Sequence, residues 1–356
     1  MATSSNPHPS VRPDWLALTY EEALDPELPI IDAHHHLWGT PGDRYFVDEM
    51  LGDIAGGHNI VASVFVEGET AQYENGPIEL RPVGETEMAA DQAVMAVERG
   101  EAKIATAIVA RADLTLGAAV GSVLDAHISA GAGRFRGIRH STPWHADPSA
   151  HGSTRFTPAG LLYDPVFRQG LAELADRNLV FDTWMYHTQL GDLVDLAHAM
   201  PELNIVMNHT GGPLGIGPYV GRRDEVFSDW KHWMCRLAAC PNVTMKLGGL
   251  GMRMAGFGFA TMQKPPTSEF LARTWQPYIE TCIEQFGAER CMFESNFPVD
   301  KGSMPYTILW NTFKRLAKQC DPQERHSLFF STANRVYLME IDNPQRSGER
   351  VQNGPN

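Results

Sequence analysis

Eight short apolar segments alternate with longer amphipathic segments along most of the chain. Most of the apolar segments are continuous runs of β-branched or aliphatic residues, typical of parallel strands covered on both faces. A strand followed by a helix therefore recurs about eight times, which predicts an α/β fold, a single-domain (β/α)8 or TIM barrel. We expect the strands near Leu28–Ala33, Ile60–Val66, Ile104–Val109, Phe135–His140, Leu179–Thr183, Asn204–Asn208, Val243–Leu247 and Arg290–Phe293.

The alternative fold is a doubly wound open sheet, but no Gly-x-Gly-x-x-Gly follows an early strand. No linker divides the chain, and 356 residues suffice for one large core. We expect an N-terminal extension over residues 1–27, the barrel over residues 28–341 and a polar tail over residues 342–356.

Composition excludes several classes of partner. The formal net charge is −14 and no basic run occurs, so we expect neither nucleic acid nor an anionic membrane as a partner. No apolar stretch approaches the roughly 20 residues that cross a bilayer. The N-terminal residues lack the apolar segment of a signal peptide. The five cysteines form no Cys-x-x-Cys pair, which indicates reduced thiols and a cytoplasmic location.

The first expected strand ends in Asp32-Ala33-His34-His35-His36. Side chains two residues apart on a strand share one face, so His34 and His36 should point together and His35 the other way. Two imidazoles side by side where a strand ends form half of a metal site. Asp32 could orient a ligand histidine instead of binding metal itself.

The other ligands should come from the same rim, because barrel active sites lie at the C-terminal ends of the strands. A single histidine there is more often structural than a ligand. Five on one rim, with the other nine scattered, indicate a bound divalent metal. The five are His34, His36, His140, His187 and His209.

Further rim residues have two interpretations each. Arg139 could bind a substrate carboxylate through its planar guanidinium, or form a salt bridge across the rim. Glu67 could ligate or bridge metal, act as acid or base, or pair with Arg139. Trp184 and Tyr186, after the fifth strand, are candidate substrate-binding residues.

Several motifs resemble the amidohydrolase superfamily, specifically the "amidohydrolase 2" branch of metal-dependent TIM-barrel hydrolases, which includes lactonases of sugar acids. The resemblance covers about residues 28–341. The matching segments are Ile31–Trp38, Gly137–His140, Asn208–Gly212, Cys291–Pro298 and Ser331–Tyr337.

The resemblance implies that His34, His36, His187 and His209 are metal ligands. It also implies an Asp at the start of the eighth-strand Asp-x-Pro motif, where this chain has Asn296. An amide cannot accept a proton at neutral pH, so the usual base is lost. Glu67, Glu294 or Asp300 could replace it.

Three functions remain open from the sequence. The first is hydrolysis of a small, carboxylate-bearing lactone or amide by metal-activated water, with Arg139 holding the carboxylate. The expected catalytic residues are Glu67, His140, Asn296 and Asp300, and Glu67 is also a candidate ligand. The second is a non-haem oxygenase with two iron or manganese ions, acting on a small amino or carboxylic acid. The third is a metal-dependent decarboxylase, or an inactive paralogue that partners an active chain.

The cofactor is accordingly expected to be one or two divalent ions, either zinc or iron and manganese. The small-molecule substrate is the expected partner, together with other copies of this chain or a related chain in an oligomer.

Overall fold

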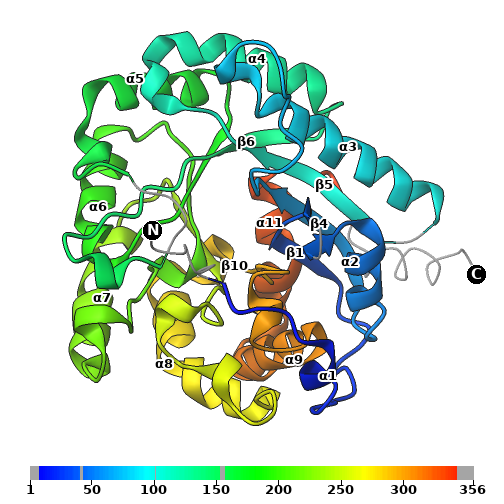
Figure 1. Ribbon diagram of the computed structural model, residues 1–356. Helices are drawn as coiled ribbons and strands as arrows, with labels where there is room; N and C mark the ends of the chain where they lie inside the picture. Colours follow the sequence, from blue (N-terminus) through cyan, green and yellow to red (C-terminus); the bar gives the residue numbers. More distant parts are fainter. Residues whose placement is uncertain (1–7, 41–42, 101, 153–156, 343–356) are drawn as a thin grey trace, which may run out of the picture.

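The computed structural model describes residues 8–40, 43–100, 102–152 and 157–342. Eight parallel strands form a nearly closed barrel, and helices surround it (Figure 1). The barrel strands follow one another in chain order, which confirms the predicted TIM barrel. They are β1 (Ile30–His35), β4 (Ile60–Val66), β5 (Lys103–Ala110), β6 (Phe135–Arg139), β7 (Val180–Thr183), β8 (Ile205–Met207), β9 (Val243–Leu247) and β10 (Cys291–Phe293).

Helices lie between successive strands and surround the barrel, while α1 precedes β1 and three helices follow β10. They are α1 (Pro13–Leu16), α2 (Val47–Ile54), α3 (Val83–Glu98), α4 (Gly121–Ala130), α5 (Pro165–Asp176), α6 (Leu190–Ala199), α7 (Arg223–Ala238), α8 (Ser268–Phe286), α9 (Tyr306–Leu316), α10 (Pro322–His326) and α11 (Thr332–Val336). The first residues of α5 show why a helix begins there. Asp164 accepts hydrogen bonds from the backbone of Val166 and Phe167, and Pro165 occupies the first helical position.

A small second sheet lies at the barrel mouth. Strands β2 (Trp38–Thr40) and β3 (Asp43–Tyr45) pair antiparallel, directly after β1. Of the tail expected over residues 342–356, all but residue 342 lies outside the described residues. No helix in the described part of the chain is both long enough and apolar enough to span a membrane.

The barrel closes where its first and last strands meet. The backbone N–H of His36 donates to the Phe297 carbonyl at 2.7 Å, and that of Asn296 donates to the His34 carbonyl at 2.8 Å. Beneath them, Asp32 accepts from the Ser295 backbone at 2.9 Å and from the Tyr306 hydroxyl at 2.9 Å. Closure therefore places the His-x-His motif directly beside Asn296.

A buried ion pair lies in the barrel interior. Lys246 on β9 donates from Nζ to Asp182 Oδ1 on β7 at 2.7 Å. Asn208 Nδ2 donates to the same oxygen at 2.7 Å, and the Tyr337 hydroxyl donates to Asp182 Oδ2 at 2.8 Å. All four side chains are buried. The carboxylate is thus fully hydrogen-bonded, as a buried charge requires.

We predict that Lys246→Met lowers the free energy of unfolding by roughly 3–5 kcal/mol, because it leaves the Asp182 charge buried without a cation. Chemical denaturation followed by circular dichroism measures the change. Arg273→Met is the matched control, since Arg273 pairs with Glu269 on the exposed face of α8 and should matter little. Equal effects of the two substitutions would contradict the prediction.

Candidate metal centre and substrate pocket

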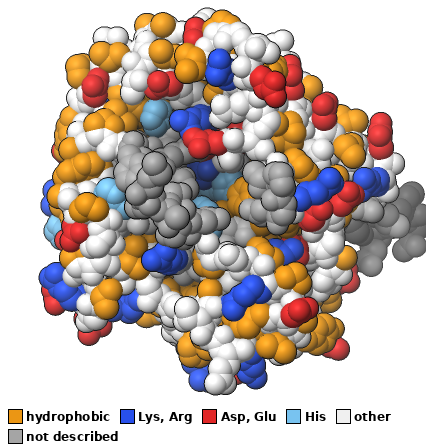
Figure 2. Space-filling model, in the orientation of Figure 1, with side chains coloured by type: hydrophobic (Ala, Val, Ile, Leu, Met, Phe, Trp, Pro, Cys, Tyr) orange, Lys and Arg blue, Asp and Glu red, His pale blue; other side chains and the backbone are white. Residues whose placement is uncertain are grey.

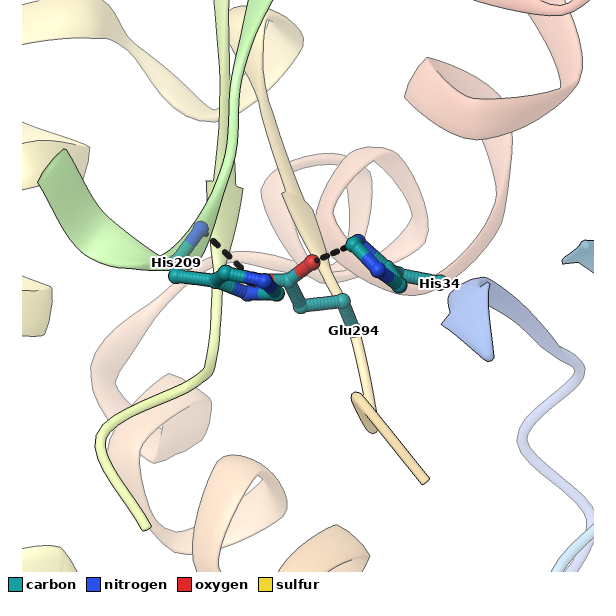
Figure 3. Close-up of side chains that lie close together, drawn as sticks. All are labelled: His34, His209 and Glu294. Carbon is teal, nitrogen blue, oxygen red and sulfur yellow. Dashed lines mark hydrogen bonds and ion pairs between the residues drawn. The ribbon is translucent and has the colours of Figure 1, made fainter. Parts of the chain in front are cut away.

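The carboxylate of Glu294 lies between two imidazoles (Figure 3). Its Oε2 is 2.8 Å from His34 Nδ1, and its Oε1 is 2.8 Å from His209 Nδ1. The backbone N–H of His209 also donates to Oε1, at 2.8 Å. The His34 contact lies off the ideal hydrogen-bond direction. All three side chains are buried, and ligand-type atoms of the three lie within 4.8 Å of one another.

His36, one residue past the end of β1, lies beside His34 and completes the cluster. Its Nδ1 lies 2.8 Å from the Val66 carbonyl oxygen and 3.1 Å from that of Glu67. Carbonyl oxygens only accept, so Nδ1 of His36 carries the proton and Nε2 has the lone pair. The Nε2 atoms of His34 and His36 are 3.2 Å apart, as the predicted shared face requires.

The contacts of His34 and His209 show in the same way which ring nitrogen carries the proton. Arg139 can only donate, and its Nη1 lies 3.2 Å from His34 Nε2, so that nitrogen accepts. Nδ1 of His34 and Nδ1 of His209 both face Glu294 and hold the protons. Nδ1 of each of the three imidazoles thus lies toward an acceptor, and Nε2 of His34 and Nε2 of His36 carry lone pairs.

Burial keeps the imidazoles of His34 and His36 neutral. It lowers the pKa of His34 well below its usual value, and the positive charge of Lys246 adds to the effect. It lowers the pKa of His36 in the same way, and there Arg139 adds to it. A neutral imidazole is the form that binds metal.

This donor set fits a divalent cation. Two lone-pair nitrogens 3.2 Å apart have no hydrogen between them, and this spacing suits two ligands each about 2.1 Å from one ion. Asn296 Oδ1, another acceptor, lies 3.3 Å from His36 Nε2. Among the described residues, the ion-pair partners of Glu294 are the two imidazoles, so its buried charge lacks a Lys or Arg.

Two glycines after β9 make room for this arrangement. A Cβ on Gly248 would lie 2.4 Å from Cγ of Glu294, and one on Gly249 would lie 2.5 Å from Cβ of His209. Gly249 also has a φ of +67°, which L side chains rarely adopt. The Gly-Gly pair is therefore a steric requirement of the cluster.

A pocket of about 620 Å³, open mouth included, lies beside the cluster. Histidine, basic and acidic side chains gather at the centre of this face of the molecule (Figure 2). Of the residues predicted from sequence, five line the pocket: His36, Arg139, Trp184, His209 and Asn296. The prediction did not include His8, Trp38, Glu69 and Ser141, which also line it.

Arg139 and Glu67 form a buried salt bridge. Nε of Arg139 donates to Glu67 Oε1 at 2.7 Å, and Nη2 donates to the Glu67 carbonyl oxygen at 2.6 Å. The structure thus contains the salt bridge considered from sequence, while the guanidinium also reaches the pocket wall. Glu67 does not belong to the close group formed by Glu294 and its imidazoles.

Two predicted histidines lie elsewhere. The His140 ring packs edge-on against Phe167 at 5.0 Å between ring centroids, and its Nδ1 accepts from the Leu114 backbone at 3.4 Å. The His187 ring lies 5.2 Å from that of Tyr219, and burial lowers its pKa to about 4. Neither histidine lines the pocket or belongs to the close group.

Tyr186 and Asp300 are also outside the pocket lining. The Tyr186 hydroxyl accepts from the Gly152 backbone at 2.9 Å. Asp300 accepts from Asn296 Nδ2 at 3.2 Å and from the Gly251 backbone at 3.2 Å. Burial raises the pKa of the Asp300 carboxyl well above its usual value. Asp300 therefore reaches the pocket only through Asn296.

Known proteins match the chain over most of its length. A sequence model of the family described as Amidohydrolase matches residues 31–338. The protein y4mH of Sinorhizobium fredii is 32% identical over 87% of this chain and 99% of the relative. An L-fucono-1,5-lactonase of Burkholderia multivorans is 26% identical over 58% of this chain and 64% of the relative.

A solved structure has the same fold. It is an amidohydrolase of Burkholderia multivorans with bound zinc, 23% identical, covering 87% of this chain and 99% of the other, with a TM-score of 0.62. The family match spans the entire barrel, from β1 through α11. The chain belongs to the amidohydrolase family.

Proposed function

We propose that this protein is a metal-dependent hydrolase of small lactones, with zinc as its metal. The observation that carries the proposal is the set of three buried imidazoles whose Nδ1 atoms lie against acceptor oxygens, which makes their Nε2 atoms the candidate ligands. A bound cation would replace the contact of His34 Nε2 with Arg139. His34, His36 and His209 would hold the ion, and Glu294 would orient two of them. Bound zinc supplies a Lewis acid that polarises a carbonyl group and lowers the pKa of water.

The pocket wall suits an oxygen-rich substrate. Polar side chains line it, among them those of Glu69, Ser141 and Asn296. Such groups can exchange hydrogen bonds with hydroxyl and carbonyl oxygens of a ligand. Arg139 adds a cation to the same wall. A lactone of a sugar acid offers such oxygens, and one relative is named an L-fucono-1,5-lactonase.

The proton acceptor is assigned to Glu69. Asn296 lines the pocket but its amide cannot take a proton. The carboxylates of Glu67 and Asp300 lie outside the lining, whereas Glu69 is part of it and forms an ion pair with Arg111. In this proposal Glu69 takes the proton of the attacking water.

The other functions considered from sequence have less support. The comparisons provide none for the oxygenase. The complete imidazole cluster argues against an inactive paralogue. Decarboxylation uses a similar metal site, so the experiments below include it.

Glu294→Gln should weaken zinc binding roughly 10–100-fold, measured by competition with a chromophoric chelator. The amide presents one donor and one acceptor, so one of the two imidazoles must move its proton to Nε2 and lose its lone pair. His145→Ala is the control, because His145 contacts Tyr219 on the rim and lies outside the cluster. Wild-type affinity in the Gln variant would contradict the orienting role.

Glu69→Gln should lower kcat for lactone hydrolysis roughly 10²–10⁴-fold while KM changes little, because a general base is lost and binding is kept. Steady-state kinetics on the zinc-loaded protein measure both constants. Zinc content of the variant, measured in parallel, checks that the metal site is intact. A kcat within about threefold of the wild type would remove Glu69 from the mechanism.

The function itself is tested with zinc-loaded protein and a panel of 1,4- and 1,5-lactones of sugar acids, followed by proton release. We expect hydrolysis that a chelator abolishes, zinc restores and His36→Ala eliminates. Aromatic carboxylic acids and oxygen-electrode measurements are run beside the panel. Release of carbon dioxide or uptake of oxygen without lactone hydrolysis would overturn the proposal in favour of a decarboxylase or an oxygenase.

A further inference from the structure

The N-terminal segment before the family match crosses the mouth of the barrel. The match begins at residue 31, whereas the described chain begins at His8, whose side chain lines the pocket. In Figure 1 the dark-blue segment leads from the centre of the barrel mouth across to α1 at its edge. We name residues 8–25 the N-terminal strap.

The strap is fastened to the loop between β9 and α8. Trp15, which is 8% exposed, donates from Nε1 to the Met262 carbonyl at 2.9 Å. Thr19 donates from Oγ1 to the Pro265 carbonyl at 2.7 Å. Arg12 stacks over the Trp15 ring, with 4.3 Å from its guanidinium carbon to the ring centroid. The two hydrogen bonds tie the strap to residues 247 and 246 positions away in the chain.

Helix α9 fixes the other end of the strap. Asn311 accepts from the Leu24 backbone at 2.8 Å and donates to Glu21 at 3.0 Å. Lys314 donates from Nζ to the carbonyls of Leu24 and Asp25, both at 2.7 Å. The strap is therefore bound at both its middle and its C-terminal end, and it has a defined path to the pocket.

The strap approaches the pocket closely at Gly302. A Cβ at Gly302 would lie 2.2 Å from the Pro9 carbonyl oxygen and 2.8 Å from its side chain. Gly302 follows Val299 and Asn296, which line the pocket. Its hydrogen side chain lets Pro9 lie against this loop, and His8, one residue earlier, then faces the pocket.

We propose that the strap is part of the substrate site and that His8 is a substrate-positioning residue, contacting an oxygen of the lactone far from its carbonyl group. The inference rests on the proposed lactonase function. An imidazole can donate to or accept from a hydroxyl group, so it suits a sugar-acid lactone. By covering part of the mouth, the strap selects small, monocyclic substrates.

His8→Ala and Gly302→Ala test this inference in the full-length, zinc-loaded protein. Both should raise KM for a monosaccharide lactone about tenfold with little change in kcat, because a binding contact is lost and the reacting groups are untouched. The Ala methyl group at residue 302 displaces Pro9, while the backbone there is outside the left-handed region. The double variant should be no worse than Gly302→Ala alone, since both act through His8.

Gly52→Ala on α2 is the matched control. Nothing lies within 4 Å of a Cβ at this exposed position, so KM should stay at the wild-type value. A disaccharide lactone provides the specificity readout, because both strap variants should discriminate less against it than the wild type does. Zinc affinity should be unchanged in all three variants.

The failures of the two proposals are distinguishable. Wild-type lactonase activity, combined with a His8→Ala KM within twofold of the wild type, overturns the strap inference alone. Absence of any lactone hydrolysis by the wild type overturns the proposed function and with it the substrate role of His8. Hydrogen exchange then still tests whether the strap is bound to the barrel. The amides of Leu16 and Leu24 should be protected, and rapid exchange of both would contradict a bound strap.

Discussion

One carboxylate sets the chemistry at the barrel mouth. Each oxygen of Glu294 lies 2.8 Å from an imidazole Nδ1, one from that of His34 and the other from that of His209. The Nε2 lone pairs must then point elsewhere, and that of His34 lies beside that of His36. A buried carboxylate without a Lys or Arg partner among the described residues is electrostatically incomplete, and a divalent cation on the far side of the two rings would complete it.

The strands under this cluster are held by charges that are already paired. Lys246 compensates Asp182 inside the barrel, and Arg139 compensates Glu67 at the rim. Among the described residues Asp32 has no ion-pair partner and is held by hydrogen-bond donors, while burial raises its pKa to about 6. The first ion pair connects β9 to β7, and the second connects β6 to the residue after β4.

The sequence was sufficient for the barrel and for the proximity of His34 and His36. Continuous β-branched runs mark strands buried on both faces, and all eight are present. The alternation of side chains along β1 placed His34 and His36 together, and their Nε2 atoms are in contact. Past the strand ends this rule stops, because loop dihedrals set the direction of each side chain. His209 and Asn296 have φ values of +55° and +54°, which no sequence pattern predicts.

The same limit explains His140 and His187, which follow strands as ligands would but turn to Phe167 and Tyr219. Glu294 was visible at the end of β10, yet its contact with two imidazoles depends on the room left by Gly248 and Gly249. The strap was unpredictable for another reason. Its contacts are with residues about 250 positions away, and it has no periodic pattern.

Anomalous diffraction at the zinc absorption edge, on crystals of the zinc-loaded protein, tests the central claim most directly. We predict one zinc peak at the Nε2 atoms of His34, His36 and His209, with Glu294 still in contact with Nδ1 of both His34 and His209. Zinc bound by the Glu294 carboxylate itself, or no peak within reach of these three imidazoles, would contradict it.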